Sequence, residues 1–307
     1  MLHYWSLENV NLKNVWLTIG QFDGVHRGHQ QIIRKLTAGA QAVQSPAGVI
    51  TFFPHPAVVL GKREKPAYLT TPEERAVLLG DFGVDVVITH PFDSQIANTS
   101  AQDFMTNLVA KVNVTRLMVG HDFALGRDRA GDVTKLKELG KQLGYTLTVV
   151  PPVKIEGEVI SSSVIRKSLF AGQVERAAKL LGRAYRINGT VIPGDGRGRT
   201  IGIPTANLNL WKERALPAAG VYVCRAQVNG KALGAVTNIG IRPTFKPKSE
   251  LTWVETHLLD FSENIYDQEI QLDFIAHLRD EQRFPDVQSL VEQIHKDITA
   301  ARKILDS

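Results

Sequence analysis

Cysteine is nearly absent from this sequence. Cys224 is the single thiol among 307 residues, so the chain cannot form an internal disulfide, and this usage is typical of proteins kept in a reducing compartment. Cys224 lies in an apolar run that is typical of a strand, which favours a core position over a reactive one. The composition therefore excludes the class of small secreted proteins that depend on disulfides.

Long hydrophobic runs are also absent. No segment approaches the roughly 20 apolar residues that cross a bilayer, and the first ten residues, MLHYWSLENV, lack the basic start and apolar stretch of a signal peptide. We therefore expect no membrane partner and a cytoplasmic location.

Positive charge is in modest excess but is not concentrated. The 36 Lys and Arg residues outnumber 31 Asp and Glu, giving a net charge of +5, yet they are scattered along the chain. A nucleic-acid binder usually carries a basic stripe with exposed aromatic residues, so we expect no nucleic-acid partner. Anionic small substrates account for the excess equally well. The length is sufficient for two hydrophobic cores.

The stretch VWLTIGQFDGVHRGHQQIIRKL, residues 15–36, combines three features. An apolar run at Val15–Ile19 suits a buried strand, a turn follows with Gly20, Gly24 and Gly28, and the apolar residues beyond it have helical spacing. A glycine turn at a helix start presents backbone N–H groups and the positive end of the helix dipole to an anion. The pattern therefore predicts a phosphate-binding turn.

His26 and His29 lie at the mouth of this turn. Two imidazoles three residues apart can donate to the same phosphate oxygens and stabilise charge that develops on them. Two alternatives remain for an H-x-x-H pair: exposed histidines without a role, or a metal site, although no neighbouring cysteine or third histidine completes a ligand set.

The pattern G-x-F-D-G-V-H-x-G-H resembles the signature of the nucleotidylyltransferase superfamily. This resemblance implies transfer of a nucleoside monophosphate from a triphosphate, with His26 and His29 as catalytic residues. It also implies an ATP site that includes Gly20, Phe22, Asp23 and Gly28.

Strand and helix patterns alternate through the first half of the chain, which predicts a doubly wound parallel sheet. The strands are expected at Val49–Phe53, Val84–His90, Thr115–Gly120 and Leu147–Val150, and helices at Thr71 to near Gly83, from Ser100, and across residues 136–143. Loops after strands bind ligands in such sheets. Phe53 ends one strand, and His55 and Asp122 lie in loops that follow strands, so these three are candidate pocket residues, although the prolines beside His55 suit a rigid turn as well.

Ser162, Ser163 and Arg166 open a further predicted helix. Serine hydroxyls at a helix start either cap their own backbone or donate to a phosphate, and an arginine one turn later adds a fixed positive fork. The segment resembles the motif S-S-T-x-I-R of the flavin-nucleotide branch of the superfamily, with Ser163 in place of threonine. The resemblance implies that Ser162 and Arg166 are catalytic, that Ser163 binds ATP, and that all three hold the departing pyrophosphate.

The pattern changes after Gly182. Short strands without intervening helices are expected, which predicts a small antiparallel barrel, and an amphipathic helix from about Pro285 is expected to pack on it. The strands are Tyr185–Ile192, Gly220–Val228, Lys231–Ile239, Thr252–Phe261 and Glu269–Ile275, with a tight Asn229-Gly230 turn. We place the domains at residues 1–182 and 183–307.

A glycine-rich loop in this half contains Gly194, Gly196, Arg197 and Gly198, which can surround phosphates through backbone N–H groups and a guanidinium, although the loop lacks the Walker pattern. Thr205 and Asn207 add neutral oxygens of the kind that Mg²⁺ binds. Glu255 alternates with apolar neighbours, and a carboxylate inside a barrel is costly unless it is paired or functional. A general base is one such function.

The segments GRGRTIGIPTAN, NIGIRPTF, VETHLLDF and LRDEQRFP resemble the bacterial riboflavin kinase domain. With the first half, they match the order found in the bifunctional riboflavin kinase/FMN adenylyltransferase, or FAD synthetase, family. The resemblance implies phosphorylation of riboflavin by the second domain and adenylylation of FMN to FAD by the first, with ATP and Mg²⁺. It assigns Glu255 as the base and Thr205 and Asn207 to Mg²⁺ and ATP. The flavin-binding residues that it implies are Phe53, His55, Asp122, Arg279 and Glu281.

The alternative is a nucleotidylyltransferase that acts on a different acceptor and carries a non-catalytic barrel. We expect a monomer or a weak homo-oligomer with small-molecule substrates.

Overall fold

The computed structural model describes all residues except 9, 63–65, 195, 244–249 and 307. The chain divides into two compact units, Met1–Ser162 and Ser163–Ser307. By this division the helices α7 (Ser162–Phe170) and α8 (Val174–Leu181) lie almost wholly in the second unit. The domain boundary expected after residue 182 stays a prediction.

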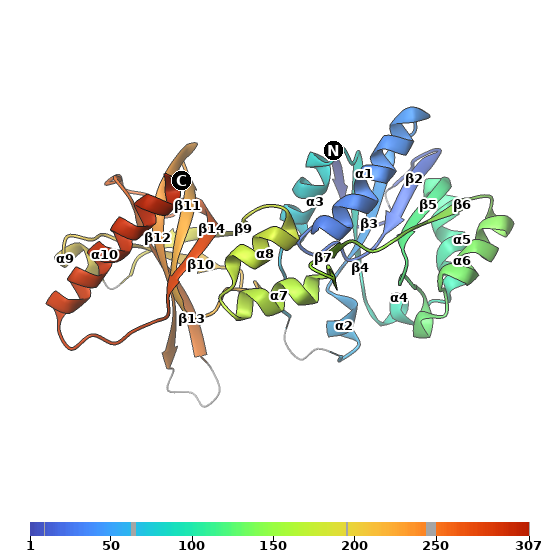
Figure 1. The fold of residues 1–307 in the computed structure, drawn as a ribbon. Helices are drawn as coiled ribbons and strands as arrows, with labels where there is room; N and C mark the ends of the chain where they lie inside the picture. Colours follow the sequence, from blue (N-terminus) through green and yellow to red (C-terminus); the bar gives the residue numbers. More distant parts are fainter. Residues whose placement is uncertain (9, 63–65, 195, 244–249, 307) are drawn as a thin grey trace. The chain divides into compact units, whose positions relative to one another are not determined.

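The first unit is built on a six-stranded sheet in which every pair of neighbouring strands is parallel (Figure 1). The strands, in sheet order, are β1 (Leu2–Tyr4), β4 (Val86–Pro91), β3 (Ala47–Phe53), β2 (Val15–Ile19), β5 (Val114–Gly120) and β6 (Thr146–Val150). The predicted parallel sheet is confirmed.

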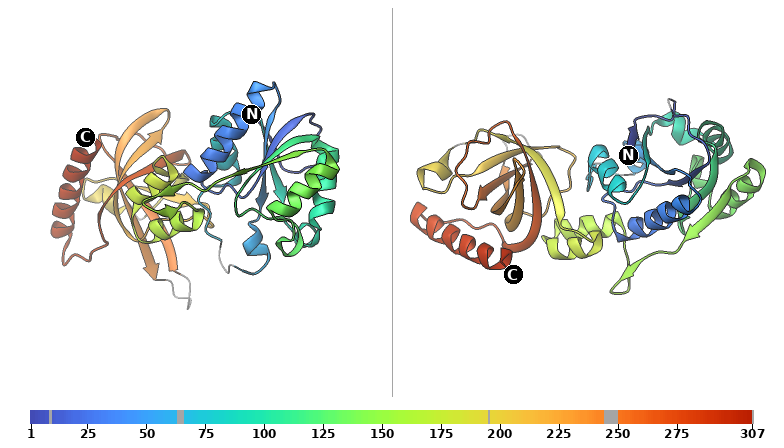
Figure 2. Two further views of the ribbon diagram at one scale, coloured as in Figure 1. Left: turned by 45° about the vertical axis from the view of Figure 1, so that its right-hand side comes forward. Right: turned by 90° about the horizontal axis from the view of Figure 1, so that it is seen from above.

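Helices cover both faces of this sheet (Figure 2). On one face, α1 (Arg27–Ala42) and α3 (Pro72–Asp81) share a core with alternate strand residues such as Val49 and Val87. On the other, α5 (Ala101–Val112) and α6 (Val133–Leu143) share a core with Ile50 and Ile88. Because both faces are buried, the strands appear in the sequence as continuous apolar runs.

Shorter elements connect these layers. They are α2 (Pro56–Val59), α4 (Ser94–Asn98), the 3₁₀ turn η1 (Arg127–Arg129), and a small hairpin of β7 (Lys154–Ile155) and β8 (Glu158–Val159). The start of α3 is closed by a reciprocal capping box: the Thr71 hydroxyl accepts from the Glu74 N–H, and the Glu74 carboxylate accepts from the Thr71 N–H.

The second unit contains the predicted antiparallel barrel, which is closed. Its strands, in order around the barrel, are β10 (Ala206–Leu210), β13 (Glu250–Leu258), β12 (Lys231–Pro243), β11 (Gly220–Val228), β14 (Glu269–Arg279) and β9 (Tyr185–Ile192). Asn229 and Gly230 both have positive φ, 49° and 74°, between the paired residues Val228 and Lys231. This is the two-residue hairpin turn that the Asn-Gly pair predicts.

The terminal helix α10 (Val287–Leu305) packs on the barrel through Ala301 and neighbouring apolar residues, with Val221, Val223 and Val236 on the strands beneath. A one-turn helix, α9 (Arg197–Thr200), leads from the glycine loop toward β10. Strand β10, which the sequence did not predict, closes the barrel between β9 and β13.

Cys224 lies inside β11 and is fully buried, and this burial raises the pKa of its thiol to about 12. Because the thiolate is the reactive form, we expect no measurable modification of native protein by a disulfide reagent at pH 8. One equivalent should react in denaturant. Rapid labelling of the native chain would contradict the core assignment.

Candidate functional site

The glycine turn follows β2 where the connections of the sheet change direction. Strand β2 pairs with β3 on one side and with β5 on the other, and open α/β sheets bind ligands at this switch point, outside the carboxyl ends of the strands. The N–H of Val25 donates to the carbonyl of Phe22 at 2.9 Å, which closes a tight turn.

Two bulky residues of the turn have left-handed backbone conformations. Phe22 has φ 48° and Val25 has φ 40°, and both side chains are buried. Such conformations cost of order 1–3 kcal/mol each for bulky or β-branched residues and persist only where surrounding contacts hold them.

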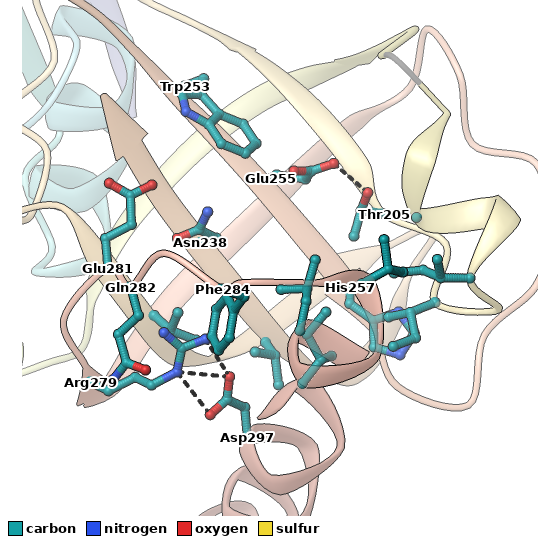
Figure 3. A pocket seen from close by; sticks show the side chains of 18 of the residues that line it. Thr205, Asn238, Trp253, Glu255, His257, Arg279, Glu281, Gln282, Phe284 and Asp297 are labelled. Carbon is teal, nitrogen blue, oxygen red and sulfur yellow. Dashed lines mark hydrogen bonds and ion pairs between the residues drawn. The ribbon is translucent and has the colours of Figure 1, made fainter. Parts of the chain in front are cut away.

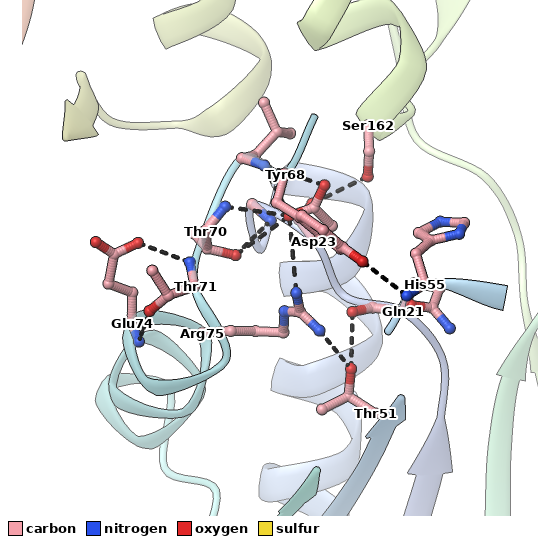
Figure 4. Close-up of polar contacts among 12 residues, drawn as sticks. Gln21, Asp23, Thr51, His55, Tyr68, Thr70, Thr71, Glu74, Arg75 and Ser162 are labelled. Carbon is pink, nitrogen blue, oxygen red and sulfur yellow. Dashed lines mark hydrogen bonds and ion pairs between the residues drawn. The ribbon is translucent and has the colours of Figure 1, made fainter. Parts of the chain in front are cut away.

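The carboxylate of Asp23 provides such contacts (Figure 4). It is 1% exposed and accepts hydrogen bonds from the N–H groups of Leu69 (2.9 Å) and Thr70 (3.1 Å) and from the Thr70 hydroxyl (3.3 Å). The N–H of Gly24 donates to the same hydroxyl oxygen at 3.1 Å. The turn is thereby fastened to residues 69 and 70.

Two further residues join this network from other elements. The Ser162 hydroxyl donates to the backbone carbonyl of Asp23 at 2.9 Å. From α3, Arg75 approaches the Asp23 carboxylate at 3.9 Å and donates to the Thr51 hydroxyl oxygen at 2.8 Å. Sequence reasoning did not identify Thr70 or Arg75.

The structure brings His26 and His29 together at the start of α1. Their rings stack with centroids 3.5 Å apart, and the Nδ1 of His26 accepts from the His29 N–H at 3.3 Å, which caps the helix. A Cβ on Gly28 would lie 3.1 Å from the His26 ring, so a larger residue here would press on that ring. Burial, followed by the positive charge that His26 would carry, lowers the pKa of His29 well below its ordinary value. His29 is therefore a neutral imidazole near pH 7.

The candidate flavin residues of the first unit lie at the end of β3 and in the loops after β3 and β5. Phe53 lies beside the ring of Tyr68, with centroids 5.6 Å apart, and the His55 N–H donates to the Tyr68 hydroxyl oxygen at 2.7 Å. The His55 ring also accepts from the Ala57 N–H and so caps α2. Asp122 is exposed after β5, where its carbonyl accepts from Arg129.

Ser163 and Arg166 lie on α7 in the second unit. The guanidinium of Arg166, whose side chain is largely buried, donates to the Ser163 hydroxyl oxygen at 3.4 Å. Their roles stay predictions.

The barrel contains a pocket of about 690 Å³ (Figure 3), within the size range of small-molecule sites. Glu255 accepts a 2.5 Å hydrogen bond from the Thr205 hydroxyl, and Asn207 lies directly opposite Glu255 across β10 and β13. The structure therefore brings together the three polar residues that the sequence proposed. Gly196 and Gly198 also line the pocket.

The glycine loop approaches these polar residues closely. A Cβ on Gly194 would lie 1.9 Å from the Asn207 amide nitrogen, and one on Gly198 would lie 3.1 Å from the Thr205 hydroxyl oxygen. The side chain of Arg197 lies outside the part of the chain that the structure describes.

The donor set at this end of the pocket suits Mg²⁺, which prefers oxygen ligands and a few carboxylates supplemented by substrate phosphates. Thr205, Asn207 and Glu255 offer oxygens of three kinds. Asn238, opposite Glu255 on β12, adds a buried amide oxygen with no hydrogen-bond partner among the described residues. Within the same described residues, no group of three or more His, Cys, Asp or Glu side chains forms a metal cluster.

Arg279 and Glu281 line the other side of the pocket. The Arg279 guanidinium makes three hydrogen bonds of 2.8–3.1 Å to Asp297 of α10 and lies 5.7 Å from the centre of the Phe284 ring. Both Glu281 and Trp253 border Gly240, where a Cβ would meet them within 3 Å. Sequence reasoning missed Asn238, Trp253 and Asp297. The two-residue spacing of Trp253 and Glu255 along β13 was the available signal.

The fold thus defines a nucleotidylyltransferase-type sheet domain joined to a riboflavin-kinase-type barrel. Residues 8–164 match the FAD synthetase family and residues 181–305 the riboflavin kinase family. The chain belongs to the bifunctional riboflavin kinase/FMN adenylyltransferase family.

Individual relatives agree over nearly the whole chain. The protein named bifunctional riboflavin kinase/FMN adenylyltransferase in Pseudomonas fluorescens is 38% identical over 94% of this chain and 92% of its own length. The protein of the same name in Bacillus subtilis is 38% identical over 92% and 89%. A crystal structure from Streptococcus pneumoniae, described as a macrolide-efflux protein, is 31% identical with a TM-score of 0.89 over 98% of both chains. Among the described residues of this chain, no helix is long and apolar enough to cross a membrane.

The buried Arg279–Asp297 pair yields a stability prediction. Asp297→Ala leaves a guanidinium that is 15% exposed without its counter-ion, which should destabilise the second unit by about 3 kcal/mol. Urea unfolding followed by hydrogen exchange in β14 and α10 measures this. The control is Asp260→Ala, which breaks the exposed Arg302–Asp260 pair and should change stability little. Equal losses of stability in the two variants would show that the Arg279–Asp297 pair stabilises the second unit no more than an exposed ion pair does.

Proposed function

We propose that this chain makes FAD from riboflavin in two ATP-dependent steps, with one step in each predicted domain. The domain at residues 183–307 phosphorylates riboflavin to FMN, and the domain at residues 1–182 transfers AMP from ATP to FMN. The observation that carries the proposal is the barrel pocket in which Glu255 accepts a hydrogen bond from Thr205, with Asn207 opposite on the neighbouring strand. A barrel that only recognised substrate would not need this half-buried polar arrangement.

In the kinase step, Glu255 takes the proton of the ribityl 5′-hydroxyl as its oxygen attacks the γ-phosphorus of ATP. The bond from the γ-phosphorus to the bridging oxygen breaks, and ADP leaves. Thr205 donates its hydroxyl hydrogen to Glu255, so its oxygen lone pairs stay open to a cation. Thr205 and Asn207 would hold Mg²⁺, which neutralises charge on the phosphates when bound. Gly194, Gly196, Arg197 and Gly198 contribute to the ATP site.

The rest of the pocket lining suits a flat ring system. Trp253 and Phe284 supply aromatic surface, while Arg279 and Glu281 supply polar groups. Because Asp297 holds the Arg279 guanidinium, this wall is ordered before substrate arrives, which limits the entropy lost on binding. We assign the isoalloxazine ring of riboflavin to this side.

In the adenylylation step, a phosphate oxygen of FMN attacks the α-phosphorus of ATP, and pyrophosphate leaves. No enzyme nucleophile is needed, so positioning and charge stabilisation account for the rate. Gly20, Phe22, Asp23 and Gly28 shape the ATP site, and His26 and His29 donate to the phosphoryl oxygens. Ser162, Ser163 and Arg166 hold the pyrophosphate, and Phe53, His55 and Asp122 contact the flavin.

We also propose that the protein works in the cytoplasm as a monomer or weak homo-oligomer, with small molecules as its substrates. The single cysteine is compatible with a reducing compartment.

The kinase assignment predicts the effect of Glu255→Gln. Loss of a general base should lower FMN formation from riboflavin and ATP by about 100-fold or more, while FAD is still made from added FMN at the normal rate. Chromatography of the flavin products measures both steps. Unchanged FMN formation by this variant would show that Glu255 is not the base, whereas absence of FMN formation by the wild-type chain would favour a transferase that acts on another acceptor.

The adenylylation assignment predicts the reciprocal effect for His29→Ala. Loss of a donor to the transferring group should reduce FAD formation from FMN by about 100-fold, with FMN formation retained. Each variant serves as the control for the other. A folded variant that lost both steps would contradict the assignment of one reaction to each unit.

A further inference from the structure

Arg75 is an unusual residue for the interior of a protein. Its side chain is fully buried on α3, and its Nε and Nη2 atoms have no hydrogen-bond partner among the described residues. The Asp23 carboxylate oxygen lies 3.9 Å from Nη2, beyond hydrogen-bond distance. A buried guanidinium with unsatisfied donors is destabilising by itself, so its presence requires an explanation.

The contacts of Arg75 lead to both flanks of the phosphate-binding turn (Figure 4). Its Nη1 donates to the Thr51 hydroxyl oxygen, and that hydroxyl donates to the carbonyl of Gln21 at 2.9 Å. On the other flank is Asp23, whose carboxylate fastens the turn to residues 69 and 70. The guanidinium therefore lies between the residues that precede and follow Phe22, one of the two residues with positive φ.

Arg75 lies in a helix start that is fixed by capping hydrogen bonds. The reciprocal capping box of Thr71 and Glu74 fixes the first turn of the helix, and Arg75 follows immediately. The Arg75 N–H completes a helical hydrogen bond to the Thr71 carbonyl at 3.0 Å. The capped first turn of α3 thus places the Arg75 guanidinium next to the phosphate-binding turn.

Arg75 has looser contacts with carboxylates than another largely buried arginine has. Arg279 makes three close hydrogen bonds to Asp297, whereas Arg75 makes none to a carboxylate of the described residues and approaches Asp23 only at 3.9 Å. Its influence reaches the catalytic histidines, because the charge of Arg75 contributes, after burial and His26, to lowering the pKa of His29. A positive charge next to the phosphate-binding turn would attract the negative charge of a bound triphosphate.

We propose that Arg75 is a positioning residue of the adenylyl-transfer site. It holds the Gln21–Asp23 segment through Thr51 and Asp23, and it adds a fixed positive charge to the triphosphate site. This inference rests on the proposed function of the first unit. Groups that are oriented before the reaction stabilise developing charge without reorganisation. The alternative is that Arg75 only fills space in the core.

The test measures FAD formation from FMN, ATP and Mg²⁺ with the full-length chain, giving kcat and the KM for ATP. Arg75→Met removes charge and hydrogen bonds and should lower kcat/KM by about 100-fold. Arg75→Lys keeps the charge, but a single ammonium group cannot contact Thr51 and Asp23 together as a planar guanidinium can. The kcat/KM of this variant should therefore be only about tenfold below the wild-type value. The control is Arg116→Met, which removes a half-buried arginine that lies over Trp16 near the opposite end of the sheet and should change the rate little.

Hydrogen exchange of β2 and α1 shows whether each variant keeps the native first unit, and riboflavin phosphorylation by the second unit reports the active concentration. Wild-type adenylylation by folded Arg75→Met would overturn the proposal, as would equal losses in the methionine and lysine variants. If Arg75→Met does not fold, Arg75→Lys decides, because a wild-type rate overturns the positioning role and a tenfold fall with native exchange supports it. Absence of FAD formation by the wild-type chain would instead refute the proposed function.

Discussion

The candidate site of the first unit depends on the hydrogen bonds that the buried carboxylate of Asp23 accepts. It accepts two backbone N–H groups and a hydroxyl from residues 69 and 70, while its own backbone carbonyl accepts from Ser162. These contacts hold a turn whose residues Phe22 and Val25 have unfavourable backbone conformations. The strain is compensated by charge-assisted hydrogen bonds, which are among the stronger contacts available in a protein interior.

The second unit orders its polar groups by a different route. Register across the barrel strands places Asn207 and Asn238 on either side of Glu255, and the loop glycines let the backbone approach Asn207 and Thr205. The Arg279–Asp297 pair then connects the far wall of the pocket to α10. Both units satisfy the same constraint, because phosphate transfer requires polar groups that are in place before the substrate binds.

Sequence patterns predicted the elements whose residues are buried on both faces or follow strong turn chemistry. Strand β10 escaped prediction because Asn207 and Asn209 interrupt its short apolar pattern, and neither residue favours a strand. Arg75 gave no functional signal, since an arginine beside Glu73 and Glu74 at a helix start is typical of a solvated surface. Only the tertiary structure shows that this arginine points inward and that Asp297 reaches Arg279.

Synthesis of FAD from riboflavin requires this one chain to direct two oxygen nucleophiles to two different phosphorus atoms of ATP. The most direct measurement follows ³²P placed at the α, β or γ position of ATP during FAD synthesis from riboflavin. The two-step mechanism predicts that γ label enters the flavin phosphate, that α label enters the adenylyl phosphate, and that β label never enters FAD. Label from the β position in FAD, or γ label absent from the FMN formed on the way, would contradict it.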